Sequence, residues 1–240
     1  MHRFRCDELA ELAPGSFVRL EKGENAHFFR TLRAAEGDRC ILMDGRGCVG
    51  EAEVAAGKSL ILRSRRTVQR PPGLAVHLYL APPRRQKMDQ ILKQCAELGV
   101  RRIVPMVCAR SVSLPDEDAV SGRWTELMFE GCKQSGNAFV PETGASMRFP
   151  DAVRDASDRC EAVFFGSVSG CGNETAPSVC RSAAWFVGPE GGFTAEEEEL
   201  MRRAGFRAFH FGNWTLRVET AAVCGIAILM DRFAGTPSAC

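Results

Sequence analysis

Residues 185–206, WFVGPEGGFTAEEEELMRRAGF, decide how the C-terminal part of the chain folds. The apolar run 183–187 predicts a buried strand, and Thr194 with Glu197 three residues later forms a capping box that predicts a helix start. The glycines between them therefore lie at a strand-to-helix turn. Such turns bind ligands at the carboxyl ends of parallel strands, where glycine lets the backbone approach a ligand closely.

The expected ligand at this turn is not a phosphate. Glu190 and the glutamates 196–199 would repel an anion, although they suit the positive end of the helix dipole. The order Gly-Pro-Glu-Gly-Gly also differs from the spacings of dinucleotide-binding turns and P-loops. A nucleoside that carries a cationic group is preferred, and a plain tight turn is the alternative.

Composition points to an ordinary soluble protein. The chain has 240 residues, of which 45% are hydrophobic and 25% charged. Its longest apolar stretch, 221–230, is shorter than the roughly 20 residues of a membrane span, and no charged-then-apolar leader precedes the first domain. We therefore expect a cytoplasmic protein that does not engage a membrane.

The cysteines and histidines argue against disulfides and metal. Eleven cysteines are scattered without a C-x-x-C pair, and their number is odd. The four histidines are isolated from cysteine and carboxylate ligand patterns. A reducing compartment and no bound metal are the expectation.

Charge is distributed unevenly along the chain. The net charge is only +1, but residues 1–110 carry 20 Lys and Arg against 12 Asp and Glu, an excess of +8. Residues 111–240 carry 11 against 18, an excess of −7. A basic N-terminal half suits an anionic polymer such as RNA, and solvated surface charge is the alternative.

The first 70 residues predict a small β-barrel domain. Short strands are expected at 16–20, 39–56 and 59–68, with turn sequences such as Asp44-Gly45 and one helix over about 25–33. The sequence Arg-Pro-Pro-Gly at 70–73 then breaks regular structure. The predicted domains are residues 1–70 and 71–240.

The second domain predicts an α/β fold, because strands alternate with helices and imply a parallel sheet covered on both faces. The stretch 221–230 is apolar all round, so its helix should be buried in the core or in a subunit interface. The expected strands are 76–81, 102–107, 162–168, 183–188 and 207–212, and the expected helices are 87–98, 123–134, the glutamate-rich segment and 219–233.

A second glycine turn follows one helix and one strand later, in FHFGNWTLRVETAA at 209–222. Gly212 ends a strand, and Arg217 and Glu219 precede the last helix. Together with the Phe165-Gly166 turn, these loops are expected to converge on one ligand. Alternatively, Glu219 merely caps a helix and Arg217 forms a surface ion pair.

These motifs resemble the RsmE family of 16S rRNA methyltransferases, which methylate N3 of a uridine with S-adenosylmethionine. The similar stretches extend over nearly the whole chain, and the pairing of GPEGG with LRxET is the most specific of them. They are MHRFR (1–5), HFFRTLRAAEGD (27–38), AELGVRRIVP (96–105), EGCKQSGNAFVPE (130–142), GPEGGFTAEE (188–197) and FGNWTLRVETAA (211–222).

The resemblance implies a PUA-like β-barrel that binds RNA, followed by a SPOUT domain with a deep C-terminal trefoil knot. It also implies a homodimer that acts on 16S rRNA or the small ribosomal subunit. The implied S-adenosylmethionine contacts are Phe165, Gly166, Gly188, Pro189, Glu190, Gly191, Gly192, Phe211, Gly212, Leu216, Arg217 and Val218. In the basic half, Arg3, Arg5, Arg30 and Arg33 are the expected RNA contacts.

For catalysis, Arg217 is expected to stabilise a developing uracil oxyanion. Glu219 is either a base or the residue that holds Arg217, and the holding role is preferred. Asn137, Trp214 and Gln94 depart from the family pattern, and Trp214 either stacks on a base or packs. Competing functions are methylation of another RNA and a catalytically silent RNA-binding ribosome-assembly factor.

Overall fold

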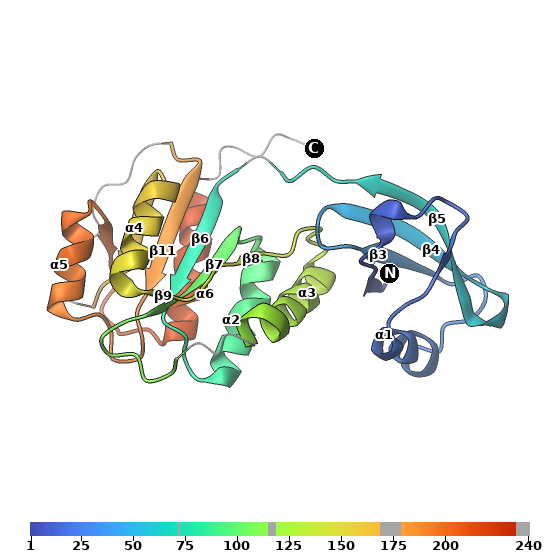
Figure 1. The fold of residues 1–240 in the computed structure, drawn as a ribbon, viewed down its shortest axis with the longest axis horizontal. Helices are drawn as coiled ribbons and strands as arrows, with labels where there is room; N and C mark the ends of the chain where they lie inside the picture. The colour runs from blue at the N-terminus through green and yellow to red at the C-terminus, as the bar shows by residue number, and fades with distance from the viewer. Residues whose placement is uncertain (72, 115–118, 169–178, 234–240) are drawn as a thin grey trace. The chain divides into compact units, whose positions relative to one another are not determined.

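The structure, a computed structural model, describes residues 1–71, 73–114, 119–168 and 179–233, which form two compact units (Figure 1). Met1–Pro71 group with Phe129–Val140, and the remaining described residues form the second unit. The sequence contained no signal that residues 129–140 would group with the N-terminal unit. Pro72, in the predicted linker, lies outside the described residues.

The N-terminal unit is built on a five-stranded sheet with the order β1-β3-β4-β5-β2. β1 pairs with β3 in parallel, and the other pairs are antiparallel. Alternate residues of β4 are buried, as expected for a strand with one face on a core. Its elements are β1 (Arg3–Arg5), β2 (Phe17–Val18), α1 (Lys22–Ala26) with a following helical turn (His27–Thr31), β3 (Arg39–Met43), β4 (Cys48–Ala55) and β5 (Ser59–Thr67).

Residues 129–140 are joined to this unit by hydrogen bonds and by close packing. The guanidinium Nη1 of Arg3 donates to the carbonyl oxygens of Lys133 at 3.0 Å and Gln134 at 3.3 Å. The Nζ of Lys133 lies 2.5 Å from a carboxylate oxygen of Glu24. Burial lowers the pKa of Lys133, but its hydrogen bonds to carboxylates outweigh this effect and raise it. This lysine therefore stays charged at neutral pH.

The C-terminal unit has a sheet with the order β12-β10-β11-β6-β7-β8, and β9 also pairs with β7. All of its recorded strand pairs are parallel, which confirms the predicted α/β fold. The strands are β6 (Ala75–Leu80), β7 (Arg102–Val107), β8 (Glu142–Thr143), β9 (Met147–Arg148), β10 (Ala162–Gly166), β11 (Ser182–Val187) and β12 (Arg207–Phe209). The helices are α2 (Arg85–Leu98), α4 (Phe149–Arg159), α5 (Ala195–Arg203) and α6 (Val218–Phe233). A further helix, α3 (Trp124–Ser135), begins in this unit and ends in the segment that groups with the N-terminal unit.

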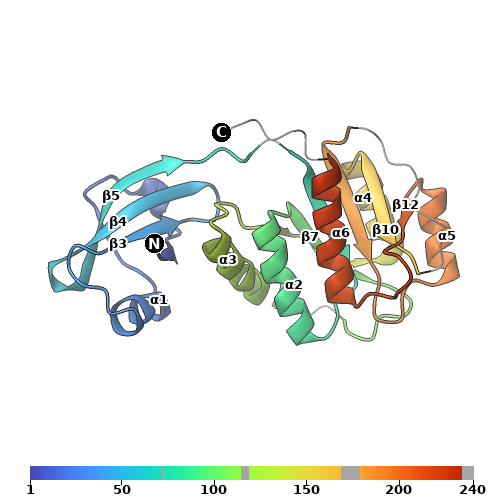
Figure 2. The ribbon, with the colours of Figure 1, turned by 180° about the vertical axis from the view of Figure 1, so that it is seen from behind.

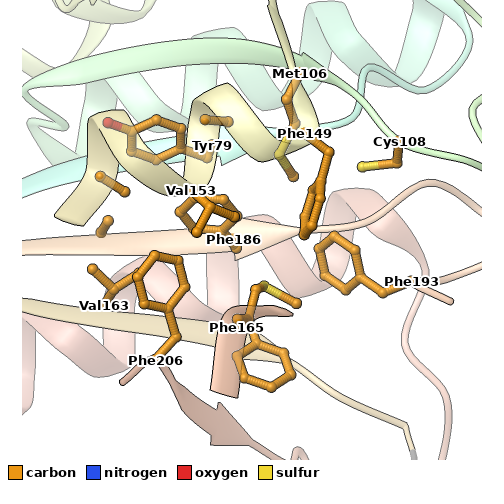
Figure 3. Packing of buried hydrophobic residues seen from close by; sticks show 14 of the residues in the cluster. Tyr79, Met106, Cys108, Phe149, Val153, Val163, Phe165, Phe186, Phe193 and Phe206 are labelled. Carbon is orange, nitrogen blue, oxygen red and sulfur yellow. The ribbon is translucent and has the colours of Figure 1, made fainter. Parts of the chain in front are cut away.

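Helices cover both faces of this sheet. Helices α4 and α5 lie over one face, and α2 and α6 lie over the other, as the two opposite views show (Figures 1 and 2). On the α4 face, the rings of Tyr79 and Phe186 stack with centroids 4.6 Å apart, within an apolar cluster that extends to Phe149 and Phe193 (Figure 3). The sequence did not predict α4.

The opposite face is organised by the contact between α6 and Trp185 of β11. The Trp185 side chain is buried, and its Nε1 donates to the carbonyl oxygen of Ala221 at 3.1 Å. At Gly225, a Cβ atom would lie 2.1 Å from the Trp185 ring, so the helix reaches this depth only because residue 225 has no side chain.

Helix α6 is buried on one side only. Ala222, Ile226 and Leu229 are buried, whereas Ala227 and Ile228 are exposed. The predicted burial of this helix is therefore confirmed within the chain for the side that faces the sheet. Within the described ranges, no helix combines the length and the apolar character needed to cross a bilayer.

Gly225→Ala should destabilise the C-terminal unit by about 3 kcal/mol, because the added methyl group overpacks the contact with Trp185. Thr220→Ala, at an exposed position of the same helix, should change stability by less than about 0.5 kcal/mol. Urea unfolding followed by tryptophan emission measures both, since all 3 tryptophans belong to this unit. Equal unfolding midpoints for the two variants would contradict the close contact between α6 and Trp185.

Candidate functional site

A cavity of about 430 Å³ lies at the carboxyl ends of β10 and β11. The two glycine turns and the turn after Phe165 all contribute to its wall, so the three loops converge as the sequence predicted. Among the residues predicted to bind the cofactor or to act in catalysis, Phe165, Gly212 and Glu219 are outside the lining. The lining consists of Lys87, residues 166–168, 185–193, 210–211 and 213–218, and Ala221.

The first glycine turn connects β11 to α5. Gly192 has φ +69°, a left-handed conformation that suits glycine, and its N–H donates to the Pro189 carbonyl oxygen at 2.8 Å. At Gly188, a Cβ atom would lie 3.2 Å from the backbone nitrogen of Phe193. The glycines therefore allow the chain to close this turn tightly beside the cavity.

The turn is held from the segment after β7 by Arg110, which sequence reasoning missed. Its Nη1 donates to the carbonyl oxygens of Gly191 at 2.8 Å and Phe193 at 3.3 Å. β7 ends at the same edge of the sheet as β11. The position of Arg110 shortly after β7 was therefore the signal in the sequence that could have identified this residue.

The predicted capping box of α5 is present. Thr194 Oγ1 accepts a hydrogen bond from the Glu197 N–H at 3.2 Å, and the Glu197 carboxylate accepts one from the Thr194 N–H at 2.9 Å. The same carboxylate accepts from the Ala109 N–H at 2.8 Å and is buried. Glu197 therefore joins the helix start to the segment that carries Arg110.

Part of the acidic start of α5 is engaged within the protein. Glu198 accepts hydrogen bonds from the Ser167 hydroxyl at 3.1 Å. A hydrogen bond from its own backbone N–H, followed by one from Thr194, lowers the pKa of Glu196. Glu190 is the carboxylate that lines the cavity among the described residues.

The second glycine turn connects β12 to α6. Gly212 has φ +88°, and the Arg217 carbonyl oxygen accepts from the Ala221 N–H at 2.8 Å as the helix begins. The Arg217 side chain is exposed and lines the cavity. It is therefore accessible from the space where a ligand would lie.

Glu219 does not hold Arg217, which corrects the preferred role predicted for it. Its carboxylate lies 3.4 Å from the Nζ of Lys87, and the structure records no ion pair between Arg217 and Glu219 in the described residues. The two side chains lie in different environments. Glu219 is in the first turn of α6 with its side chain only 14% exposed, whereas Arg217 precedes the helix and is exposed.

Lys87 is a second residue that sequence reasoning missed. It lies in the first turn of α2, where a cation is disfavoured by the helix dipole, and it lines the cavity. The Oε2 of Glu219 is buried without a hydrogen bond, so the charge of Lys87 is its main compensation. A cation in a first helical turn was the available signal.

The four arginines predicted to bind RNA differ in their freedom to do so. Arg3 is bonded to the end of α3, and the Nε of Arg5 lies 2.7 Å from a carboxylate oxygen of Asp7. Arg30 and Arg33 are exposed, and the structure records no ion pair for them in its described part. Arg30 and Arg33 are thus the stronger candidates within the N-terminal unit.

Across the described residues, no group of His, Cys, Asp and Glu is arranged to hold a metal ion.

Comparison with known sequences places the chain among RNA methyltransferases. Residues 70–230 match the RNA methyltransferase domain family. A ribosomal RNA small subunit methyltransferase E of Aquifex aeolicus (strain VF5) is 30% identical over 147 residues, which are 60% of this chain and 62% of the relative. Its counterpart in Synechocystis sp. is 26% identical over 223 residues, 88% of this chain and 71% of the relative.

Two solved structures resemble nearly the whole chain. A methyltransferase from Legionella pneumophila in complex with the cofactor SAM has a TM-score of 0.84 and 25% identity, with 98% of each chain covered. The ribosomal RNA small subunit methyltransferase E from Neisseria gonorrhoeae, bound to S-adenosyl methionine, has a TM-score of 0.82 and 26% identity, with 97% and 98% covered. The chain therefore belongs to the RNA methyltransferase family, within its group of ribosomal RNA small subunit methyltransferase E proteins.

Proposed function

We propose that the protein transfers a methyl group from S-adenosylmethionine to N3 of a uridine in 16S rRNA. The convergence of both glycine turns on one cavity carries this proposal. Relatives solved with the cofactor bound share the fold over nearly their full length. The N3 position rests on the resemblance to the RsmE family.

The cavity residues fit S-adenosylmethionine. A volume of about 430 Å³ is in the range of small-molecule sites, roughly 300–1,000 Å³. Leu216, Phe211 and the Gly166 turn would enclose the adenine, and the cation Lys87 suits the methionine carboxylate. Glu190 suits the positive charges of the amino and sulfonium groups. When bound, the cofactor supplies an electrophilic methyl group.

The side chains of the protein position the reactants and stabilise charge. Loss of the N3 proton leaves negative charge on the uracil oxygens, and Arg217 faces the cavity to stabilise it. Glu219 is outside the cavity lining, so we assign it a positioning role, in which its carboxylate holds the ammonium of Lys87.

The proposal extends to the architecture. The N-terminal unit acts as a PUA-like RNA-binding domain, supported by its five-stranded sheet. The C-terminal unit is a SPOUT domain with a trefoil knot, supported by the return of the chain from the edge strand β12 to α6 over β6 and β11. It forms a homodimer in the cytoplasm, and the exposed Ala227 and Ile228 of α6 support a subunit contact.

The direct test incubates the protein and S-adenosylmethionine with 16S rRNA, either free or in the small subunit, and digests the product for mass spectrometry. The expected product is 3-methyluridine at one position. Methylation of another atom or only of tRNA would overturn the proposed target. Cofactor binding without any methyl transfer to RNA would favour a silent assembly factor.

Arg110→Met should weaken S-adenosylmethionine binding about tenfold, because two hydrogen bonds to the Gly188–Phe193 turn are lost. Calorimetry measures the affinity. Arg154→Met, at an exposed arginine of α4, is the matched control and should bind as the wild type does. Equal affinities of the two variants would show that Arg110 does not shape the cavity.

Replacing Arg30 and Arg33 with Gln should weaken rRNA binding and make its salt dependence shallower, since each lost phosphate contact removes roughly 0.7–0.9 from the logarithmic slope. Cofactor affinity should not change. The control replaces Arg39 and Arg63, which are engaged by Glu51 and Glu53. Filter binding at several salt concentrations gives both slopes. If the control pair changed the slope as much, the RNA contacts would lie elsewhere on this unit.

A further inference from the structure

We propose that Trp214 stacks on an unpaired nucleobase of the RNA at the mouth of the cavity, an inference that rests on the proposed function. Trp214 is 83% exposed and belongs to the cavity lining. The other tryptophans, Trp124 and Trp185, are 6% and 0% exposed. Trp214 thus presents a large aromatic surface beside the site where methyl transfer would occur.

Packing within the chain does not account for Trp214. The loop between β12 and α6 is anchored by Phe211, whose ring meets that of Trp185 edge-on at 5.6 Å and that of Phe209 at 5.1 Å. Gly212 supplies its left-handed turn. These contacts hold the loop and leave the indole of Trp214 in solvent.

The surroundings of Trp214 favour a nucleobase over a protein partner. Its chain neighbours Asn213 and Thr215 are polar and exposed, so the ring does not belong to a continuous apolar segment. A cation of the same loop, Arg217, lines the same cavity. A flat aromatic ring with a cation nearby is the combination that binds an unstacked base and its phosphate.

This position makes Trp214 a determinant of substrate choice. A base held on the indole ring requires a nucleotide that is free of its own stack, as in a loop or bulge. Stacking itself tolerates every base, so Trp214 would select unpaired RNA, and cavity contacts would select uridine.

Tryptophan emission tests the proposal, because Trp214 is the exposed member of the 3 tryptophans. The probe is a short oligouridylate, titrated with S-adenosylhomocysteine present. We expect quenching of the emission and protection from acrylamide, neither of which should occur in Trp214→Phe. Trp214→Ala should weaken oligouridylate binding roughly tenfold to a hundredfold, and Trp214→Phe should retain most of the affinity.

Leu200→Ala, at an exposed apolar position of α5, is the control and should bind oligouridylate as the wild type does. Unchanged affinity of Trp214→Ala would overturn the proposal. So would protection of Trp214 from acrylamide before RNA is added, because a second copy of the chain would then cover it. A failure of the proposed function would give a different result. Oligouridylate would still quench the tryptophan emission of the wild type, but no 3-methyluridine would form in rRNA. The stacking proposal would then still hold.

Discussion

The rest of the site depends on the close packing of α6 against Trp185. Gly225 lets the helix approach the indole, and the Ala221 carbonyl accepts its N–H, so the helix is fixed in depth and along its axis. β11, which carries Trp185, leads directly into the first glycine turn, and α6 begins directly after the second. One packing contact therefore sets the distance between the two loops that form the cavity wall.

The loops are then held by charged groups that come from other elements. Arg110, after β7, fixes carbonyl groups of the first turn, and Glu197 ties that segment to the start of α5. Lys87 of α2 and Glu219 of α6 form an ion pair beside the cavity. Among the carboxylates at the start of α5, Glu197 is thus bound within the protein, to the Ala109 N–H and to its own helix start.

The sequence predicted the parallel sheet, the capping box at Thr194 and the convergence of both glycine turns, because these depend on local patterns and on strand direction. It did not predict the Lys87–Glu219 pair or the grouping of residues 129–140 with the N-terminal unit, since both depend on tertiary contacts between distant segments. Helix α4 was missed although its buried Phe149, Ala152, Val153 and Ala156 follow helical spacing. The β-barrel, the knot and the homodimer remain proposals.

The cavity between the two glycine turns is the proposed binding site of S-adenosylmethionine. Calorimetric titration of S-adenosylhomocysteine into the wild type and into Leu216→Asp tests it most directly, because Leu216 lines the cavity and is not among the buried core residues. We expect one site per chain in the wild type and loss of that binding in Leu216→Asp with an unchanged unfolding midpoint. Absence of binding to the wild type, or equal binding by the variant, would contradict it.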